Sequence, residues 1–230
     1  MVAEFGSKLE RVEESGARTP GGEVIAFSDT AGSVSMRRMA TEDPRIAPLP
    51  RDEWDERLSR LLTTFPRGAE EPMHIFTTLA RQPELFRRWL GFGGALLSGR
   101  LHGRLRELVI LRTAFRFDGR YEWAHHIELG AAQGVTTSEV AALGGDLSAV
   151  EWDPFELAAL TAVDETADDG AVTDATWSTL AQRLDSGELV ELLMLIAHYI
   201  MLSTVLRSLR VQLEPSAAAL AEGVAGGPPA

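Results

Sequence analysis

Apolar residues recur at every third or fourth position along most of this chain, which is the spacing of one face of an α-helix. Trp54, Leu58, Leu61 and Leu62 show this spacing in the first patterned segment. No segment alternates apolar and polar residues as a half-buried strand does. The pattern therefore predicts an all-α protein, a bundle of seven to nine helices.

Capping residues and helix breakers indicate where these helices end. Pro83 and Pro154 suit the first turn of a helix, Thr136 and Thr173 suit the N-cap, and Gly134 suits a C-terminal stop. We expect helices over residues 52–64, 72–80, 83–97, 101–115, 121–133, 137–143, 154–167, 174–183 and 186–210.

The longest apolar run, residues 189–206, approaches the length of a membrane span. It nevertheless contains Glu191 and His198, and Arg207 and Arg210 follow it closely. Helices that are apolar on all sides are usually buried inside a protein. We therefore expect a core helix here, and no association with a membrane.

Residues 46–214 are expected to form one helical domain. Residues 1–45 mix Gly, Ser, Thr and charged residues without periodicity, which predicts a mobile tail. Within it, residues 4–9 read as translated cloning sites, an expression scar, and Met36 is a candidate natural start. Residues 215–230 end in Gly-Gly-Pro-Pro-Ala and are expected to form a flexible C-terminal tail.

Composition and charge exclude several classes of function. The net charge of −12 argues against non-specific binding to nucleic acid, which needs a basic face. The chain has no cysteine, so disulfides, thiolate nucleophiles, zinc–cysteine sites and iron–sulfur clusters are excluded. The N-terminal residues lack the apolar core of a secretory signal, and a cytoplasmic protein is expected.

The densest chemistry lies in the run Tyr-Glu-Trp-Ala-His-His at residues 121–126. Glu122 and His126 are four residues apart and share a helix face, which His125 flanks. A carboxylate beside an imidazole is suited to proton transfer. Upstream, Glu107 lies on an apolar stripe, where a carboxylate is costly unless it is paired. These four residues are the candidate catalytic groups.

Each candidate also has a purely structural interpretation. Glu107 would then form a buried salt bridge with Arg104, Arg112 or a later arginine, and His126 would be a hydrogen-bonded core histidine. His198, mid-way along the apolar run, shares a face with Glu191 and could line a cavity. The candidate substrate contacts are Tyr121, Trp123, Arg112, His198 and Tyr199, although packing is the simpler role for the first two.

No motif indicates a bound metal or cofactor. Glu107, Glu122, His125 and His126 are residue types that bind metals, but the sequence contains no His-Glu-x-x-His, and the Glu-x-x-x-His spacing of Glu122 and His126 is not the Glu-x-x-His signature of di-iron sites. A nucleotide-binding glycine fingerprint is also absent. We therefore expect chemistry without a metal or cofactor.

Residues 106–143, RELVILRTAFRFDGRYEWAHHIELGAAQGVTTSEVAAL, resemble the carboxymuconolactone decarboxylase family, which shares its helical fold with the AhpD-like alkylhydroperoxidases. The later segments 152–154, 175–177 and 209–213 also resemble longer members of that family, so the resemblance covers residues 45–214. It implies an AhpD-like multi-helical bundle. It also implies a homo-oligomer, a trimer or hexamer with a dimer as alternative. The expected contact surfaces are the glycine-containing helix at residues 91–94 and the long apolar helix.

In the peroxidase branch of these relatives, a Cys-x-x-Cys pair precedes a histidine, and a glutamate lies on the preceding helix. By resemblance, the cysteine positions correspond to Gly119 and Glu122, the histidine to His126 and the glutamate to Glu107. The acid–base partners remain while both thiols are absent. Thiol peroxidase activity is therefore excluded, because it requires a thiolate.

The resemblance and the residues together predict a cofactor-independent lyase that decarboxylates a small organic acid or lactone by general acid–base catalysis. One alternative is a proton-transfer isomerase, cyclase or dehydratase acting on a bulkier secondary metabolite. A second alternative is a non-catalytic helical oligomer. In that case Glu107 and His126 would be paired with each other and inaccessible to solvent, and replacing either by alanine would leave function intact.

Overall fold

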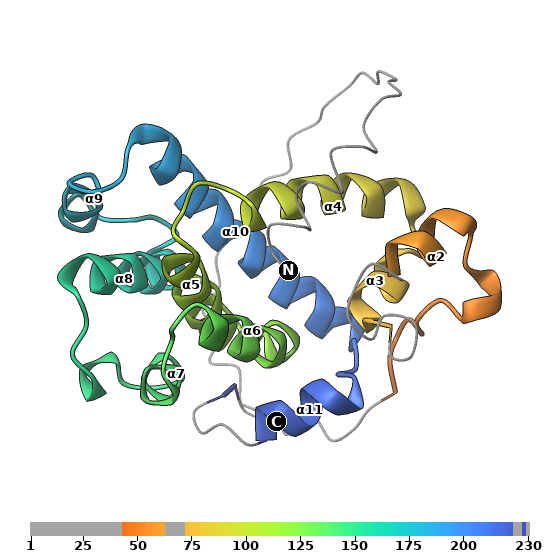
Figure 1. Ribbon diagram of the computed structural model, residues 1–230. Coiled ribbons are helices and arrows are strands. Elements are labelled where there is room, and N and C mark those ends of the chain that lie inside the picture. The colour runs from red at the N-terminus through yellow and green to blue at the C-terminus, as the bar shows by residue number, and fades with distance from the viewer. Residues whose placement is uncertain (1–42, 63–71, 223–226, 229–230) are drawn as a thin grey trace.

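The computed structural model of the chain describes residues 43–62, 72–222 and 227–228, and all the regular structure in these residues is helical (Figure 1). This confirms the all-α prediction. Two 3-10 helices, η2 (Arg51–Glu53) and η3 (Leu147–Ala149), accompany the α-helices. The α-helices are α2 (Glu56–Leu62), α3 (His74–Leu79), α4 (Pro83–Leu97), α5 (Gly103–Arg116), α6 (Arg120–Ala132), α7 (Thr137–Leu143), α8 (Pro154–Asp169), α9 (Asp174–Leu180), α10 (Ser186–Leu209) and α11 (Pro215–Glu222).

Helix α5 lies at the centre of the fold and packs against α6, α8 and α10 (Figure 1). Because neighbouring helices cover it on several sides, all residues from Leu105 to Ala114 are buried, including the charged Arg106, Glu107 and Arg112. Polar groups on this helix must therefore find partners within the protein. This central position brings the charged side chains of α5 next to α6 and α10.

Helix ends follow the expected caps closely at several places. Helix α4 spans the predicted residues, and Thr136 and Glu139 form a reciprocal capping box at the start of α7. The first predicted helix instead divides into η2 and α2, because the side chain of Asp55 accepts a hydrogen bond from the backbone N–H of Leu58 and starts a new helix. Residues 63 and 64 of that prediction lie outside the described residues.

Helix α10 crosses the whole bundle (Figure 1). It is the described helix that is long and apolar enough to cross a membrane by length and composition, and half of its most apolar window is buried inside the protein. Leu192, Leu195, Ile196 and Leu206 form part of the main core, in contact with α4, α5 and α6. One side of this helix therefore has the role of the core helix that the sequence predicts.

Part of residues 215–230, which the sequence predicts to be a flexible tail, is helical in the structure. Residues 215–222 form α11, which packs against α6. The carboxylate of Glu214, just before this helix, is buried and accepts hydrogen bonds from the Tyr121 hydroxyl (2.6 Å), His125 Nε2 (2.8 Å) and the backbone N–H of His74. These contacts explain why the helix docks. Most of the predicted N-terminal tail, residues 1–42, lies outside the described residues.

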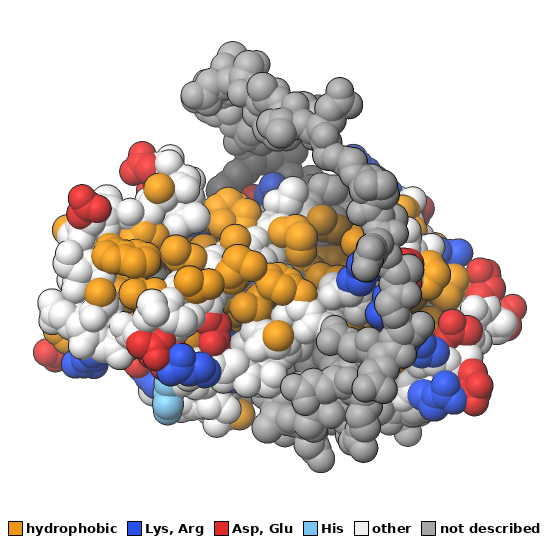
Figure 2. Space-filling model, turned by 90° about the horizontal axis from the view of Figure 1, so that it is seen from above, with side chains coloured by type: hydrophobic (Ala, Val, Ile, Leu, Met, Phe, Trp, Pro, Cys, Tyr) orange, Lys and Arg blue, Asp and Glu red, His pale blue; other side chains and the backbone are white. Residues whose placement is uncertain are grey.

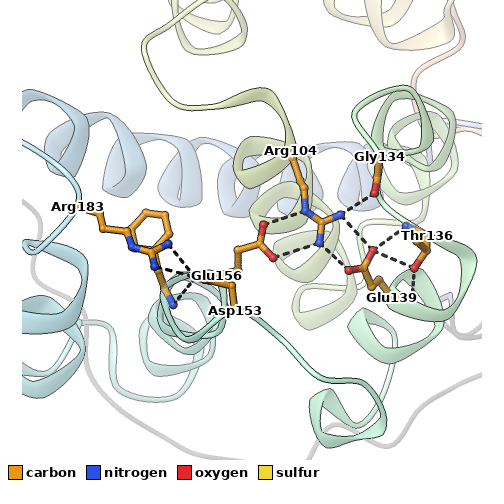
Figure 3. Close-up of polar contacts among 8 residues, drawn as sticks. Arg104, Gly134, Thr136, Glu139, Asp153, Glu156 and Arg183 are labelled. Carbon is orange, nitrogen blue, oxygen red and sulfur yellow. Dashed lines mark hydrogen bonds and ion pairs between the residues drawn. The ribbon is translucent and has the colours of Figure 1, made fainter.

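A partly buried network of charges joins α5 to the helices beside it (Figure 3). The guanidinium of Arg104 donates to the carboxylates of Glu139 on α7 (2.6 Å) and Glu156 on α8 (2.8 Å), and to the carbonyl oxygen of Gly134. Arg104 is therefore not the partner of Glu107 that the structural interpretation considered. Its contacts hold α5 in a fixed position, and so fix the polar residues on that helix.

Candidate acid–base site

The buried side chains of Glu107, His126 and Tyr199 form a continuous chain of hydrogen bonds across three helices. His126 on α6 donates through Nδ1 to Glu107 Oε2 on α5 (2.7 Å), and its Nε2 lies 3.1 Å from the hydroxyl of Tyr199 on α10. With Nδ1 protonated, the neutral ring accepts from the Tyr199 hydroxyl at Nε2. The glutamate thus sets the tautomer and orientation of the imidazole, as in known acid–base pairs.

The charges around this chain keep Glu107 ionised. Burial alone would raise its pKa, but His126 and Arg106 together hold that pKa below its ordinary value. The pKa of Tyr199 is raised well above its ordinary value by burial and by the charges of Glu107 and Glu122. Tyr199 therefore keeps its proton throughout the neutral pH range and is a hydrogen-bond donor.

Arg106 is a further member of this site that sequence reasoning did not identify. The side chain is buried and its Nε donates to Glu107 Oε1 at 3.3 Å, while its terminal nitrogens have no partner among the described residues. The signal available in the sequence was its position directly before Glu107. This leaves one buried cation beside the acid–base chain with capacity for a further anion.

Glu122 and Ser203 form the second part of the site. Both carboxyl oxygens of Glu122 and the hydroxyl of Ser203 are buried without a hydrogen-bond partner among the described residues. Burial raises the pKa of Glu122 to about 7. The expected direct contact between Glu122 and His126 is not made, since His126 is paired with Glu107 and Tyr199. Nothing in the sequence indicated Ser203, because it lies on α10, far from α6 in the chain.

His125, the other candidate catalytic histidine, lies outside this site. Its ring donates to Glu214 and packs against Tyr121, with ring centroids 4.5 Å apart. Burial would raise the pKa of Glu214, but the hydrogen bonds from His125 and Tyr121 lower it to about 2. The structure thus places His125 and Tyr121 together in the contact that docks α11.

Arg112 and Trp123, two of the candidate substrate contacts, do not belong to the hydrogen-bonded chain of Glu107, His126 and Tyr199. Arg112 is held by both carboxylate oxygens of Asp164 (2.8 Å each) and by the carbonyl oxygens of Leu143 and Gly145, so its guanidinium joins α5 to α8 and to the end of α7. Trp123 belongs to a second apolar cluster that includes Leu108 and Leu111 of α5. Neither forms a hydrogen bond with His126, whose partners are Glu107 and Tyr199.

His198 is enclosed by aromatic rings next to Tyr199. The Trp89 ring stacks on it at a centroid distance of 6.2 Å, and the Phe92 ring meets it edge-on at 5.2 Å. Its Nδ1 has no partner among the described residues, and burial lowers its pKa to about 4, so the ring is neutral. Glu191, the residue expected to share its face, instead accepts from the backbone N–H groups of Arg100 and Leu101, just before α5.

Across the described residues, no three His, Asp or Glu side chains are grouped in a way that could hold a metal ion. The two His–Glu pairs, His126 with Glu107 and His125 with Glu214, are joined by direct hydrogen bonds. The arrangement can therefore orient an imidazole, hold a tyrosine proton beside it, and supply a carboxylic acid and a hydroxyl with free hydrogen-bonding capacity.

Comparison with known proteins is consistent with this geometry. Residues 83–165 match the profile of the carboxymuconolactone decarboxylase family, and they include Glu107, Glu122 and His126. A search of curated proteins finds none with significant similarity to the chain.

Several solved structures share the fold at low sequence identity. An AhpD-core, peroxidase-related protein from Ralstonia eutropha JMP134 is 15% identical, with a TM-score of 0.69 over 79% of this chain and 98% of that protein. A cysteine-to-alanine variant of the debrominase Bmp8, in complex with 2,3,4-tribromopyrrole, is 17% identical, with a TM-score of 0.62 over 82% and 98%. The Agrobacterium tumefaciens protein ATU0492 is 19% identical, with a TM-score of 0.53 over 58% and 93%. At these identities the similarity establishes the AhpD-like fold alone.

Proposed function

We propose that this protein is a cofactor-independent lyase that decarboxylates a small organic acid or lactone, because residues 83–165 match the model of the carboxymuconolactone decarboxylase family. The observation that supports it best is the chain from Glu107 through His126 to Tyr199, with the unpartnered acid Glu122 beside it. A carboxylate that orients an imidazole, which in turn contacts a proton donor, is the equipment of general acid–base catalysis.

The proposed reaction needs no external electron acceptor. The bond between the substrate carbon and its carboxylate breaks, CO2 leaves, and the electron pair enters the conjugated carbonyl group to form an enolate. In the reacting form His126 is an imidazolium, and its Nε2 proton passes through the Tyr199 hydroxyl to the enolate carbon. Solvent then returns a proton to His126, which restores the reacting form. Glu107 stabilises the imidazolium through its hydrogen bond at Nδ1.

The buried guanidinium of Arg106 is an argument for an anionic substrate. Its terminal nitrogens have no partner among the described residues, whereas the arginine expected from sequence, Arg112, is saturated by Asp164 and two carbonyl oxygens. A buried guanidinium attracts a carboxylate and binds it through paired hydrogen bonds. In this proposal Arg106 holds the substrate acid near the acid–base chain.

The aromatic surroundings of His198 favour a second candidate, a proton-transfer isomerase, cyclase or dehydratase on a bulkier apolar compound. Trp89, Phe92 and His198 present ring faces and edges next to Tyr199. The structure of a debrominase with bound tribromopyrrole illustrates that a protein of this fold can accept a planar apolar ring. Both candidates use the same acid–base chain and differ in whether CO2 is lost.

The non-catalytic alternative predicts that Glu107 and His126 are paired and buried, which they are. That pairing does not separate the alternatives, because a catalytic pair must be held in the same way. The unpartnered oxygens of Glu122 and Ser203 favour a site with a ligand, since a purely structural cluster would satisfy its buried polar groups.

The test is an NMR assay in D2O with γ-carboxymuconolactone and a panel of β-keto and vinylogous acids. We expect CO2 release with deuterium at the substrate carbon. His126→Ala and Tyr199→Phe should each lower the rate at least about a hundredfold, because they remove the proton path. His102→Ala, which changes an exposed histidine at the start of α5, is the matched control and should not alter the rate.

The outcomes separate the candidates. Deuterium exchange at carbon that depends on His126 but occurs without CO2 loss would replace the lyase by the proton-transfer enzyme. Equal rates in the native protein and in His126→Ala would remove the acid–base chain from catalysis and leave the non-catalytic oligomer.

We also propose that the protein is a homo-oligomer, a trimer or hexamer, that uses the outer face of α10. Val190, Met194 and Met201 lie at helical spacing on this face and are exposed. Seen from above, hydrophobic side chains gather in a band across the upper surface of the molecule (Figure 2). A second copy would cover apolar surface that is otherwise in contact with water.

Introducing two carboxylates on this face of α10 is expected to prevent assembly of the oligomer. Met194→Glu with Met201→Glu would place carboxylates where apolar surface is to be buried, which costs several kcal/mol for each unpaired charge. Light scattering coupled to size exclusion should then report a monomer, while Gln182→Glu, at an exposed position after α9, should keep the native mass. A native protein that is already monomeric at micromolar concentration would contradict the proposal.

A further inference from the structure

Three buried oxygen atoms between α6 and α10 lack hydrogen-bond partners among the described residues. They are the two carboxyl oxygens of Glu122 and the hydroxyl of Ser203, residues that are 3% and 0% exposed. Burying such a group without a partner costs about 1–3 kcal/mol. A cluster of them beside an acid–base chain therefore indicates that another molecule supplies the missing contacts.

The two side chains converge on the backbone of Gly119. A Cβ atom at this position would lie 2.2 Å from Ser203 Oγ and 2.8 Å from Glu122 Oε2. The φ angle of Gly119, −80°, is accessible to any residue, so the glycine is required here by space. Residues 119 and 122 are the positions that correspond by resemblance to the two cysteines of thiol-dependent relatives. Here the Ser203 hydroxyl occupies the space that a side chain at position 119 would fill, and Glu122 stands at the position of the second cysteine.

Both groups can act as neutral hydrogen-bond donors. Burial raises the pKa of Glu122 to about 7. In a large fraction of the protein molecules at neutral pH, this side chain is therefore a carboxylic acid with an O–H group. No neighbouring charge contributes to this shift among the described residues. Ser203 supplies a second O–H group. A carboxylic acid kept neutral by an apolar site is an established way to stabilise a developing anion.

We propose that Glu122 and Ser203 together bind a single substrate oxygen, the one on which negative charge develops when the enolate forms. The proposal rests on the proposed function for its reaction, but the binding of an oxyanion can be measured separately. The ligand class is a planar conjugated compound with an enolate or phenolate oxygen. In the complex one proton is shared between Glu122 and that oxygen, and the Ser203 hydroxyl donates a second hydrogen bond.

The surrounding charges are compatible with an anion at this place. Glu107 is the ionised carboxylate of the adjoining chain, and its charge is offset by Arg106 and by its hydrogen bond from His126. Tyr199, on the same helix as Ser203, keeps its proton. An ionised Glu122 would repel an ionised ligand, so the complex requires one proton between them.

The probe is 4-nitrophenol, whose phenolate and phenol forms have different absorption spectra. We expect saturable binding to the native protein near neutral pH. Ser203→Ala and Glu122→Gln should each weaken it about tenfold, the effect of one lost hydrogen bond to a charged oxygen. Glu128→Gln, an exposed glutamate on the same helix, should bind as the native protein does. Absence of saturable binding, or unchanged affinity in both site variants, would overturn the proposal.

The pH profile provides a readout that a structural role would not alter. Because the complex holds one shared proton, affinity for the native protein should be highest near neutral pH and fall on both sides. In Glu122→Gln the alkaline fall should disappear, since no acid remains to ionise, and affinity should rise with pH to a plateau. A profile that is unchanged in Glu122→Gln would contradict the shared proton.

Failure of this proposal is distinguishable from failure of the proposed function. Phenolate binding that depends on Glu122 and Ser203 would uphold the oxyanion site even if no acid in the substrate panel is decarboxylated. Decarboxylation that depends on His126, with phenolate binding indifferent to both residues, would uphold the lyase and remove the oxyanion site.

Discussion

Glu122→Gln is expected to be more stable than the native protein above about pH 8, by about 3 kcal/mol. The pKa of this carboxyl is raised from 4.5 to about 7 by burial, so folding disfavours its ionised form. Between about pH 4.5 and pH 7 the folded protein retains a proton that the unfolded chain releases. Native stability therefore falls as the pH rises through this window, and the full penalty applies above it.

Glutamine has nearly the same shape as the protonated acid and cannot ionise, so the variant lacks this penalty. Denaturant titrations of both proteins from about pH 5 to pH 9 should show a difference that is small at the acidic end and grows toward the alkaline end. Other carboxylates with shifted pKa values, such as Glu214, contribute equally to both proteins and cancel in the difference. Two stability profiles that run parallel over this range would show that Glu122 does not titrate as an isolated buried acid.

Glu107→Leu is expected to destabilise the protein by about 3–5 kcal/mol, which is the usual cost of removing one partner from a buried ion pair. Glu107 is fully buried, and it is the hydrogen-bond partner of both Arg106 and His126. Its loss would leave the guanidinium charge of Arg106 buried and uncompensated, and Nδ1 of His126 without an acceptor. Equilibrium unfolding in urea measures the change.

A second substitution distinguishes the unpaired charge from lost packing. Adding Arg106→Met to Glu107→Leu removes the charge and keeps a long apolar side chain, so most of the lost stability should return. Coupling between the two changes is expected because the residues are in contact. A loss below about 1 kcal/mol in the single variant, or no recovery in the double variant, would contradict the role of the ion pair.

The fold was largely predictable because local signals mark its helices. Thr136 and Glu139 form the expected capping box, Pro83 and Pro154 occupy the first turns, and Thr173 caps α9. Each of these signals acts within three residues of the helix start. The docking of α11 was not predictable in this way, because it depends on Glu214 meeting a hydroxyl and an imidazole about ninety residues away in the chain.

The candidate site was predictable only in part, for the same reason. Glu107, Glu122 and His126 lie on two consecutive helices, and the structure places all three in or beside the acid–base chain. Ser203 reaches the same place from α10, with no local pattern to mark it. Tyr199 was expected as a substrate contact, and its hydrogen bond to His126 was not foreseen.

The arginines of α5 illustrate what periodicity leaves undetermined. Arg106 and Arg112 are both buried on one helix, and the pattern does not tell which of them meets the acidic residue of a neighbouring helix. In the structure Asp164 of α8 lies against Arg112 and saturates it, whereas Arg106 faces Glu107 and α10. The positions of α8 and α10 determine which arginine meets which acidic residue, and these positions are defined only in the assembled fold.

The position of Glu214 also has a consequence for the order of events during protein synthesis. A ribosome makes Tyr121 and His125 about ninety residues before it makes the carboxylate that accepts their hydrogen bonds. Until then the donors on α6, and the backbone N–H of His74, have only water as a partner. The hydrogen bond between His126 and Glu107 joins groups 19 residues apart and can form once α6 has been made, whereas the contacts of Tyr121 and His125 are completed only when Glu214 has been synthesised. Docking of the segment around Glu214 against α6 is therefore expected to be a late step in the assembly of the nascent chain.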